Sequence, residues 1–465
     1  MKKLFTSIIA LITALSLCSC TLFNGQVSDD DGLEEEDLLI VDGGISSDDQ
    51  NTTASAAQQS APKHNTVKSD VVVKVQTQQA DQEAEKEATS PALSVAIAKF
   101  DGAVKTENFY QYGTLSTAQK KAYDMVCKSI EKADNVINID KIGLTLDQAK
   151  QMLIRLIVDN PQYFWLTKQN KITYVNNGKK VSSVILYYSD GTVADRLDDN
   201  LKLTKTASRT VIDGQIKRFN SAVSSVVKAC NKGESLLTEK TLHDYLVNTV
   251  KYNSAVSSAD TGDALPHEYS AYGALCKKSA VCEGYVKAFQ FLCLQSGINS
   301  TQIMGEGKKT DHMWSAVNIN NAWYQTDVTW DDMDAQNGVY YGYFNLTKAQ
   351  MCADHTIDYN TVAVPECNST AAAYHDNFSV LIANEYSEPA NYQKAIDNLN
   401  KMGDDYLTFK FAKKPVSPKT YFAAYIYDDY SVINKYITKQ GYKITVTKEM
   451  FFFDSDCYYI KVVRM

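Results

Sequence analysis

The stretch from Ser279 to Gly297 restricts the fold of this chain more than any other. Its apolar side chains recur every three or four residues, the pattern of an amphipathic helix: Val281, Tyr285, Val286, Phe289, Leu292 and Cys293. Ser279 is expected to cap the start of this helix and Gly297 to close its end. Cys282 then lies in the first turn, where unpaired backbone N–H groups and the helix dipole stabilise a thiolate. The position suits either a nucleophile or an ordinary small core residue. A base that could act as the partner of Cys282 would distinguish these two interpretations.

The first 20 residues have the pattern of a secretory signal peptide. Two lysines precede an apolar run from Leu4 to Leu17, which is too short for a comfortable membrane span. The run ends in a segment that resembles the lipobox of bacterial lipoproteins, with cleavage before Cys20 and lipid on its sulfur. The alternative is a plain secreted protein that is cut nearby. Because two or more acyl chains anchor a protein stably, we expect a membrane-anchored protein on the extracellular face of a bacterium.

Residues 21–91 are acidic and polar, with few aromatic side chains. Such a segment cannot bury enough apolar surface to order itself, so it is predicted to be a flexible tether. The formal net charge of −8 owes much to this stretch and indicates little about a charged partner. No basic patch favours nucleic-acid binding, so we expect no nucleic-acid partner.

The composition becomes typical of a globular protein from residue 92, and the remaining length suits two or three domains. We expect an N-terminal mixed α/β domain at 92–232, a second domain at 233–366 and an α+β domain at 371–465. The predicted helices span 117–133, 146–158, 211–230, 238–250 and 392–402. The predicted strands span 171–174, 182–188, 406–411, 442–446 and 457–463, and 421–437 is predicted to be a helix or a strand pair.

The cysteines do not have the spacing of a metal site. Beyond Cys18 and Cys20, eight cysteines are scattered without a C-x-x-C pair, which argues against zinc, and both oxidised and reduced states stay open. The acidic run Asp331–Asp334 weakly resembles a calcium loop, but Tyr343 occupies the position of its bidentate Glu. We therefore expect neither a metal nor a cofactor.

The segment Asp311–Trp330 has the pattern of two strands joined by a two-residue turn at Asn320–Asn321. The turn predicts that Ile319 pairs with Ala322. Because strand side chains alternate between faces, this pairing fixes which residues share a face, and a slip of one residue would reverse every assignment.

The predicted register places two ionisable side chains on one face. Asp327 lies opposite Trp314, and His312 has the same parity as Trp314. His312 and Asp327 are thus diagonal neighbours, about 7–8 Å apart at the backbone and within reach of an imidazole–carboxylate hydrogen bond. They form a base with an orienting carboxylate, for which Cys282 is the candidate nucleophile.

Three blocks of the sequence resemble the motifs of the transglutaminase-like superfamily: 280–285, 312–317 and 323–332. Their order and spacing match, with 30 residues from Cys282 to His312 and 15 from there to Asp327. The flanks 242–246, 270–275 and 343–347 are similar to those of a secreted bacterial branch. One departure is Met313–Ser315, where many members have Ala-Trp-Asn.

The resemblance implies an α+β, papain-like core in which the nucleophile helix packs on an antiparallel sheet. In that fold Cys282 would attack an amide carbonyl as a thiolate, His312 would hold and return the proton, and Asp327 would orient the imidazole. The Cys282 backbone N–H would supply one oxyanion donor. Weaker candidates for the second donor and for substrate contacts are Tyr269, Tyr272, Trp314 and His267.

Three functions follow from this resemblance. The first is a cysteine peptidase or amidase, the second a protein-cross-linking transglutaminase, and the third an inactive binding module on the same fold. A protein or peptide substrate is expected, cell-wall peptides included. Two other histidines are expected to be structural: His243 beside Asp244, and His355 as a packing or capping residue.

Overall fold

The computed structural model describes residues 92–167, 170–175, 179–198, 200–257, 267–332, 341–382, 391–403, 406–411, 438–439, 441–445 and 457–464. These residues all belong to one compact unit. The predicted signal peptide, the tether and the element at 421–437 lie outside the described residues. No helix among the described residues combines the length and the apolarity that a membrane crossing needs.

The first part of the described chain packs helices against a small sheet. Its helical segments are η1 (Thr106–Asn108), α1 (Tyr110–Gly113), α2 (Thr117–Ile130), η2 (Asp140–Ile142) and α3 (Leu146–Asp159). The antiparallel sheet has the order β1-β3-β2, with β1 (Val136–Asn138), β2 (Lys171–Val175) and β3 (Lys180–Ile185), and β4 (Arg196–Leu197) pairs with β5 (Leu203–Lys205). Capping boxes start α2 at Ser116 and α3 at Thr145. The predicted helices and hairpin are confirmed here with small changes at their ends.

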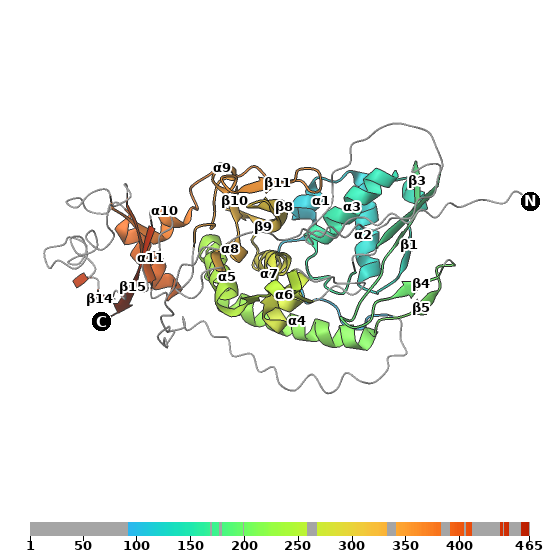
Figure 1. Cartoon of the computed structure of the whole chain (residues 1–465), viewed down its shortest axis with the longest axis horizontal. Coiled ribbons are helices and arrows are strands. Elements are labelled where there is room, and N and C mark those ends of the chain that lie inside the picture. Colours follow the sequence, from blue (N-terminus) through green and yellow to red (C-terminus); the bar gives the residue numbers. More distant parts are fainter. Residues whose placement is uncertain are drawn as a thin grey trace, which may run out of the picture. The chain divides into compact units, whose positions relative to one another are not determined.

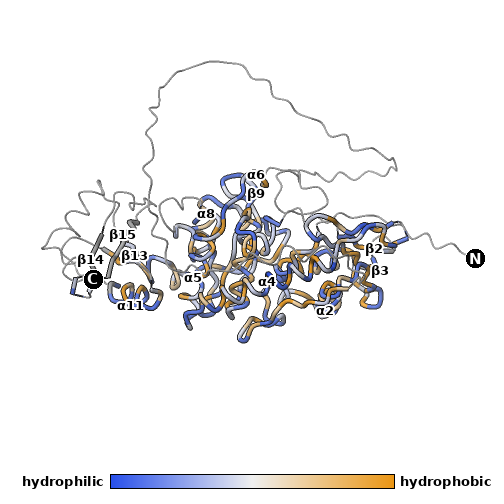
Figure 2. Tube along the Cα trace, turned by 90° about the horizontal axis from the view of Figure 1, so that it is seen from below, coloured by the Kyte–Doolittle hydropathy of each residue, from blue (hydrophilic) through white to orange (hydrophobic). Residues whose placement is uncertain are grey.

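Helix α4 (Arg209–Cys230) contributes to two hydrophobic cores. Ile212 and Ile216 pack with the residues of α2, α3 and β3. Phe219, Val223 and Val226, further along the helix, pack with α5 and α7. Figure 2 colours the chain by hydropathy and shows hydrophobic and hydrophilic residues alternating along the helices. One continuous helix therefore joins the core of the N-terminal part to the core around α7.

The central part is a four-stranded antiparallel sheet with the order β10-β9-β8-β11, and α7 lies beside β8 and β9 (Figure 1). The strands are β8 (Ser300–Gly307), β9 (Thr310–Ile319), β10 (Ala322–Thr326) and β11 (His355–Ile357). The helices are α5 (Ser235–Thr249), α6 (Ser254–Ser257), η3 (His267–Tyr269), η4 (Gly273–Lys277), α7 (Cys282–Gln295), α8 (Val328–Asp332) and α9 (Lys348–Met351). Two short parallel strands complete this part, β6 (Lys251–Tyr252) and β7 (Ser279–Ala280). The arrangement is an α+β fold, as predicted.

The predicted register of the β9–β10 hairpin is confirmed. Ile319 pairs with Ala322, and Ser315 pairs with Thr326. The two turn residues Asn320–Asn321 have φ angles of 53° and 67°. Positive φ at both central positions belongs to a type I′ turn, whose twist matches the flanking strands and for which Asn is well suited.

The prediction that Ser279 caps α7 is wrong. Ser279 lies in β7, paired with β6, and its hydroxyl accepts a hydrogen bond from Asn253 Nδ2 at 3.2 Å. Val281 occupies the N-cap position, without a side-chain cap. Because the chain leaves a strand directly before the helix, Ser279 is too early to reach the first turn.

The predicted end of α7 at Gly297 is confirmed. Gly297 has a φ of +79°, and the N–H of Ile298 donates to the carbonyl of Cys293 at 2.9 Å. A second bond runs from the Gly297 N–H to the Leu294 carbonyl at 3.3 Å. This pair of bonds is a Schellman motif, which places a left-handed residue, usually glycine, directly after the helix.

The last part combines two helices with a mixed sheet of order β12-β13-β15-β14. The helices are α10 (Tyr374–Phe378) and α11 (Tyr392–Met402), and the strands are β12 (Ser379–Ile382), β13 (Tyr406–Phe411), β14 (Tyr442–Thr445) and β15 (Cys457–Arg464). Strands β12 and β13 are parallel, and the other pairs are antiparallel. The elements predicted at 392–402, 406–411, 442–446 and 457–463 are confirmed.

Two glycines give a matched test of the α7 C-terminus. Gly297 and Gly143 share a φ of +79°, so alanine at either site costs about 1–2 kcal/mol of left-handed strain. A Cβ at Gly297 would also lie 2.8 Å from the Gly102 carbonyl oxygen, whereas a Cβ at Gly143 meets nothing within 4 Å. Thermal unfolding should therefore show a larger drop in midpoint for Gly297→Ala than for Gly143→Ala. Equal drops would contradict the close packing of this helix end.

Candidate active site

The carboxylate of Asp327 lies between the end of β10 and the start of α8, and it is fully buried. Its Oδ1 accepts hydrogen bonds from the backbone N–H groups of Thr329 at 3.0 Å and Trp330 at 3.2 Å, which caps α8. Its Oδ2 accepts from His312 Nε2 at 2.6 Å. Burial alone would raise the pKa of Asp327, but His312 and then His355 lower it to about 2. The carboxylate is therefore ionised and fixed at both oxygens.

The imidazole of His312, near the start of β9, links this carboxylate to the thiol. A side-chain hydrogen bond also links this imidazole to Cys282. Burial alone would lower the pKa of His312, but Asp327 first and Cys282 next raise it to about 10. The ring lies 5.2 Å from the Trp330 ring and 6.1 Å from the Trp314 ring, so little space is left for it to turn.

Cys282 is the first residue of α7, and its side chain is buried. At this position the backbone N–H has no acceptor within the helix, and the positive end of the helix dipole points at the thiol. The structure thus brings Cys282, His312 and Asp327 into one hydrogen-bonded chain. Burial raises the pKa of Cys293, a second thiol of α7, well above its ordinary value.

The weaker site candidates have other contacts. Trp314 Nε1 donates to Gln325 Oε1 at 2.9 Å, which leaves this side chain no N–H for an oxyanion. The Tyr269 hydroxyl donates to a backbone carbonyl at 3.1 Å. The Tyr272 hydroxyl accepts from an arginine at 3.2 Å, and the His267 ring packs on the Tyr272 ring at 4.8 Å. The identity of the second oxyanion donor stays a prediction.

His355 contacts Asp327, which the sequence-based interpretation missed. Its Nε2 lies 3.3 Å from Asp327 Oδ2, the same oxygen that binds His312, and its Nδ1 lies 2.7 Å from Asp354 Oδ1. Strand β11 places it there by pairing His355 with Gly307 of β8. No local pattern announces this contact, because His355 follows Asp327 by 28 residues and reaches it only through strand pairing.

His312, Asp327 and His355 also form a group whose potential ligand atoms lie within 4.8 Å of one another. The short His312–Asp327 distance of 2.6 Å is that of a charge-assisted hydrogen bond. Hydrogen bonds therefore account for this group, and the absence of a metal from the reaction stays a prediction.

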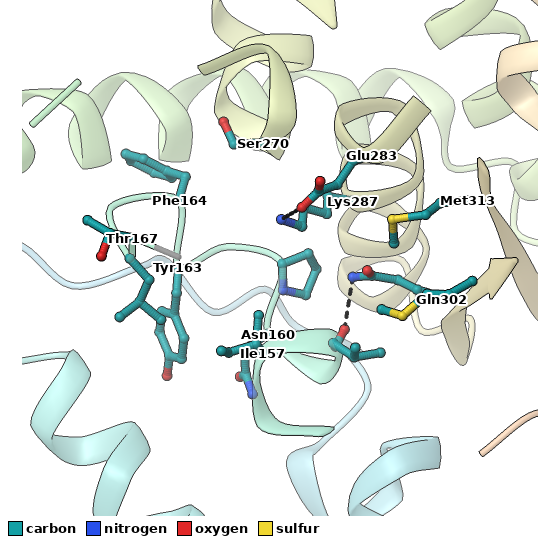
Figure 3. A pocket seen from close by; sticks show the side chains of 14 residues that line it. Ile157, Asn160, Tyr163, Phe164, Thr167, Ser270, Glu283, Lys287, Gln302 and Met313 are labelled. Atoms are coloured by element: carbon teal, nitrogen blue, oxygen red, sulfur yellow. Dashed lines mark hydrogen bonds and ion pairs between the residues drawn. The ribbon is translucent and has the colours of Figure 1, made fainter. Parts of the chain in front are cut away.

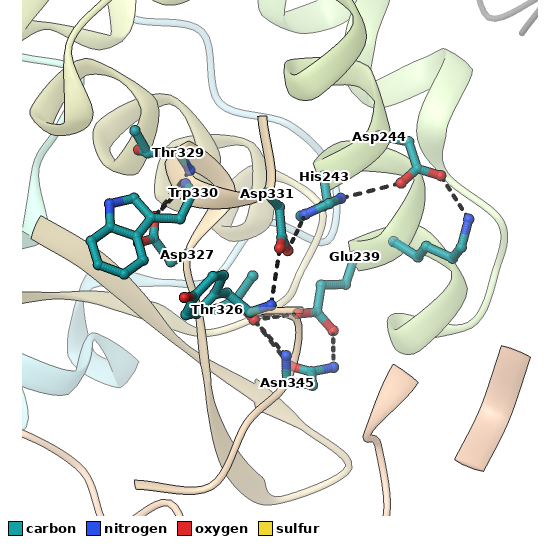
Figure 4. Close-up of polar contacts among 11 residues, drawn as sticks. Glu239, His243, Asp244, Thr326, Asp327, Thr329, Trp330, Asp331 and Asn345 are labelled. Atoms are coloured by element: carbon teal, nitrogen blue, oxygen red, sulfur yellow. Dashed lines mark hydrogen bonds and ion pairs between the residues drawn. The ribbon is translucent and has the colours of Figure 1, made fainter. Parts of the chain in front are cut away.

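A second buried polar network lies behind Asp327 and ties its loop to α5 (Figure 4). His243 Nε2 lies 3.0 Å from Asp331 Oδ2, and His243 Nδ1 lies 3.2 Å from Asp244 Oδ1. Burial alone would lower the pKa of His243, but these two carboxylates raise it to about 9. Glu239 of α5 accepts from Asn345 Nδ2 at 2.8 Å. His243 therefore has the structural place expected for it, as a brace between α5 and α8.

Comparison with protein families gives a match for the segment that carries these three residues. Residues 224–328 match the model described as the transglutaminase-like superfamily. This segment is a transglutaminase-like domain. The matched residues include Cys282, His312 and Asp327, and they cover α5, α7 and strands β8 to β10. The family is one of thiol enzymes, which agrees with the buried Cys–His contact.

Solved structures similar to this chain are distant. One is described as a TGase, with 14% identity over 36% of this chain and 45% of that chain, and a TM-score of 0.23. Another is a candidate cysteine protease from Cytophaga hutchinsonii, with 16% identity over 37% of this chain and 64% of that chain, and a TM-score of 0.20. No curated protein matches. This chain therefore spans about half to two thirds of the length of these structures.

The contact between His355 and Asp327 predicts an effect on acid stability. Asp327 has a folded pKa of about 2, below its ordinary 3.8, so it contributes stability above that ordinary value and loses it as the pH falls toward 2. His355→Leu removes one partner of a buried carboxylate, at a cost of about 1.5–3 kcal/mol. When the thermal unfolding midpoint is measured from pH 2 to 7, the fall in midpoint at acid pH (the acid limb) should begin at a higher pH in this variant.

His355→Gln is the matched control for that experiment, because glutamine can still donate a hydrogen bond to Oδ2. It should restore most of the acid limb. If His355→Leu lowers the midpoint by the same amount at every pH, His355 packs against its neighbours without stabilising the Asp327 charge.

Proposed function

We propose that this chain is a cysteine-dependent acyl-transfer enzyme that acts on amide or peptide bonds, and that it hydrolyses them as a peptidase or amidase. The hydrogen-bonded chain Cys282–His312–Asp327 at the start of α7 carries this proposal. The transglutaminase-like domain supports it, because that superfamily uses the same three residue types. A protein-cross-linking transglutaminase is the alternative.

The contacts suggest a sequence of steps. Because the pKa of His312 is raised to about 10, its imidazole keeps the proton of Cys282 and leaves a thiolate. The thiolate attacks the amide carbonyl, and the Cys282 backbone N–H donates to the oxyanion. His312 returns the proton to the leaving amine, which departs and leaves a thioester. Water then attacks the thioester while His312 accepts its proton, which releases the acid and regenerates the Cys282 thiolate beside the His312 imidazolium.

The N-terminal sequence suggests where this chemistry takes place. We place the enzyme at the extracellular face of a bacterium, held to the membrane by lipid on Cys20 and extended from it by the tether at 21–91. Proteins and peptides near that surface, cell-wall peptides among them, are the proposed substrates. We propose no nucleic-acid partner, metal or cofactor.

Alkylation of Cys282 by iodoacetamide across pH 4 to 9 tests the thiolate. We expect the rate to persist well below the free-thiol pKa of about 8.5, because the thiolate is paired with an imidazolium. His312→Ala should abolish reaction at low pH, and Asp327→Asn should weaken it by removing the charge that raises the His312 pKa.

Mass spectrometry should follow the Cys282 peptide and the Cys293 peptide together. Cys293 is the internal control, since burial raises its thiol pKa and it should stay unmodified. Slow alkylation of Cys282 that rises only near pH 8 and ignores His312→Ala would contradict the enzyme and favour an inactive binding module.

A labelled amine separates hydrolysis from cross-linking. The chain is incubated with casein and a fluorescent primary amine, with Cys282→Ala as the control. We expect new amino termini or released ammonia without fluorescence on the protein, because water resolves the thioester. Incorporation of the amine that depends on Cys282 would instead establish the transglutaminase alternative.

A further inference from the structure

A hollow lies beside the first turns of α7, where Glu283, the residue after Cys282, lines it (Figure 3). The segment that follows α3 forms one side of it, and strands β8 and β9 form another. Its empty volume is about 640 Å³, part of which is open to solvent. Much of the wall is apolar: Val158, Pro161, Phe164, Leu166, Met304 and Met313.

Glu283 and Lys287 project from α7 into this hollow (Figure 3). Glu283 Oε1 accepts from Lys287 Nζ at 2.5 Å, and Lys287 Nζ also donates to the Tyr269 carbonyl at 3.2 Å. Glu283 is only 4% exposed, yet its Oε2 has no hydrogen-bond partner among the described residues. Because a buried polar atom without a partner costs free energy, this oxygen points to a ligand that donates to it.

The other polar side chains of the hollow already have partners. Gln302 Nε2 donates to the Val158 carbonyl at 3.1 Å and to Gln290 Oε1 at 2.8 Å. Asn160 Nδ2 donates to the Tyr123 hydroxyl and to the Leu156 carbonyl, both at 2.7 Å. Among the described side chains that line the hollow, Glu283 Oε2 is the buried atom without a partner, and Lys287 has a third N–H that can donate beside it.

The charges of this pair select the kind of ligand. The opposite charges of Glu283 and Lys287 cancel. A ligand ammonium would be repelled by Lys287, and a ligand carboxylate would be repelled by Glu283. An uncharged group that both donates and accepts can bond to the two at once. A carboxamide or a hydroxyl meets this requirement, whereas an apolar side chain would leave Oε2 without a partner.

We propose that this hollow is a substrate subsite for an uncharged polar side chain, of the carboxamide or hydroxyl type, next to the amide bond that Cys282 attacks. The inference rests on the proposed function. Glu283 follows Cys282 directly, and consecutive Cα atoms are about 3.8 Å apart, close to the length of one extended residue. In the proposed complex, the side chain adjoining the reacting residue of a bound peptide would enter the hollow from the start of α7.

Peptide chloromethyl ketones of the form acetyl-X-Gly test the subsite, since they bind as peptides and then alkylate Cys282. X is Gln, Thr, Met, Glu or Lys, so that the uncharged polar side chains are compared with apolar and charged ones. Each inactivation rate constant is divided by the iodoacetamide rate constant of the same variant. We expect Gln or Thr to exceed Met, Glu and Lys by about tenfold, the discrimination of one hydrogen bond to a charged group.

Glu283→Gln keeps the shape of the side chain but places a donor where Oε2 accepts, so this preference should fall to about one. Glu234→Gln is the matched control, because it removes another Glu–Lys pair, the exposed Glu234–Lys401 contact at 2.6 Å. It should leave the preference unchanged. If Glu283→Gln does not fold, Lys287→Met takes its place in the comparison. This variant removes the donor of the same pair.

The outcomes separate the two proposals. Equal rates for all five peptides on a chain that iodoacetamide alkylates rapidly would overturn the subsite while the thiol enzyme stands. A preference for Met would show that the hollow is apolar in function and would overturn it as well. A Cys282 that neither reagent alkylates below pH 8 contradicts the proposed function itself.

Discussion

The buried carboxylate of Asp327 is the interaction on which the rest of the site depends. One oxygen caps α8, and the other binds His312 and His355. An ionised carboxylate without water is stable only where hydrogen bonds and opposite charge surround it. Strands β9, β10 and β11 and helix α8 therefore need one relative arrangement, and that arrangement also points His312 at Cys282.

The polar network behind Asp327 extends this constraint to α5. His243 links the buried Asp331 to the half-buried Asp244, and Glu239 binds Asn345, whose backbone N–H donates to Thr326, the residue before Asp327. Buried polar networks are stable when every member has a partner, and each becomes costly when one partner is lost. Helix α5 thus contributes to the site without touching the thiol, by fixing the loop that carries Asp327.

Helix α7 joins the thiol to the adjoining hollow. Cys282 takes the helix start, where the dipole favours a thiolate, and Glu283 faces the hollow one residue later. The Schellman motif at Gly297 fixes the far end of the same helix. In the proposed enzyme, neighbouring residues on one helix would set both the chemistry and the substrate choice. Helix α4 packs against α7 in one of the two hydrophobic cores to which it contributes.

Local patterns of the sequence determined several helices and one contact between residues far apart in the chain, that of His312 with Asp327. The helix periods predicted α2, α3, α4 and α7, and the Asn320–Asn321 turn predicted the register that brings His312 to the face of Asp327, because side chains alternate strictly along a strand. The contact of His355 with Asp327, the place of Ser279 in a strand and the unpartnered oxygen of Glu283 were decided by tertiary structure alone. Each depends on segments far apart in the chain meeting in space, and no pattern of neighbouring residues encodes such a meeting.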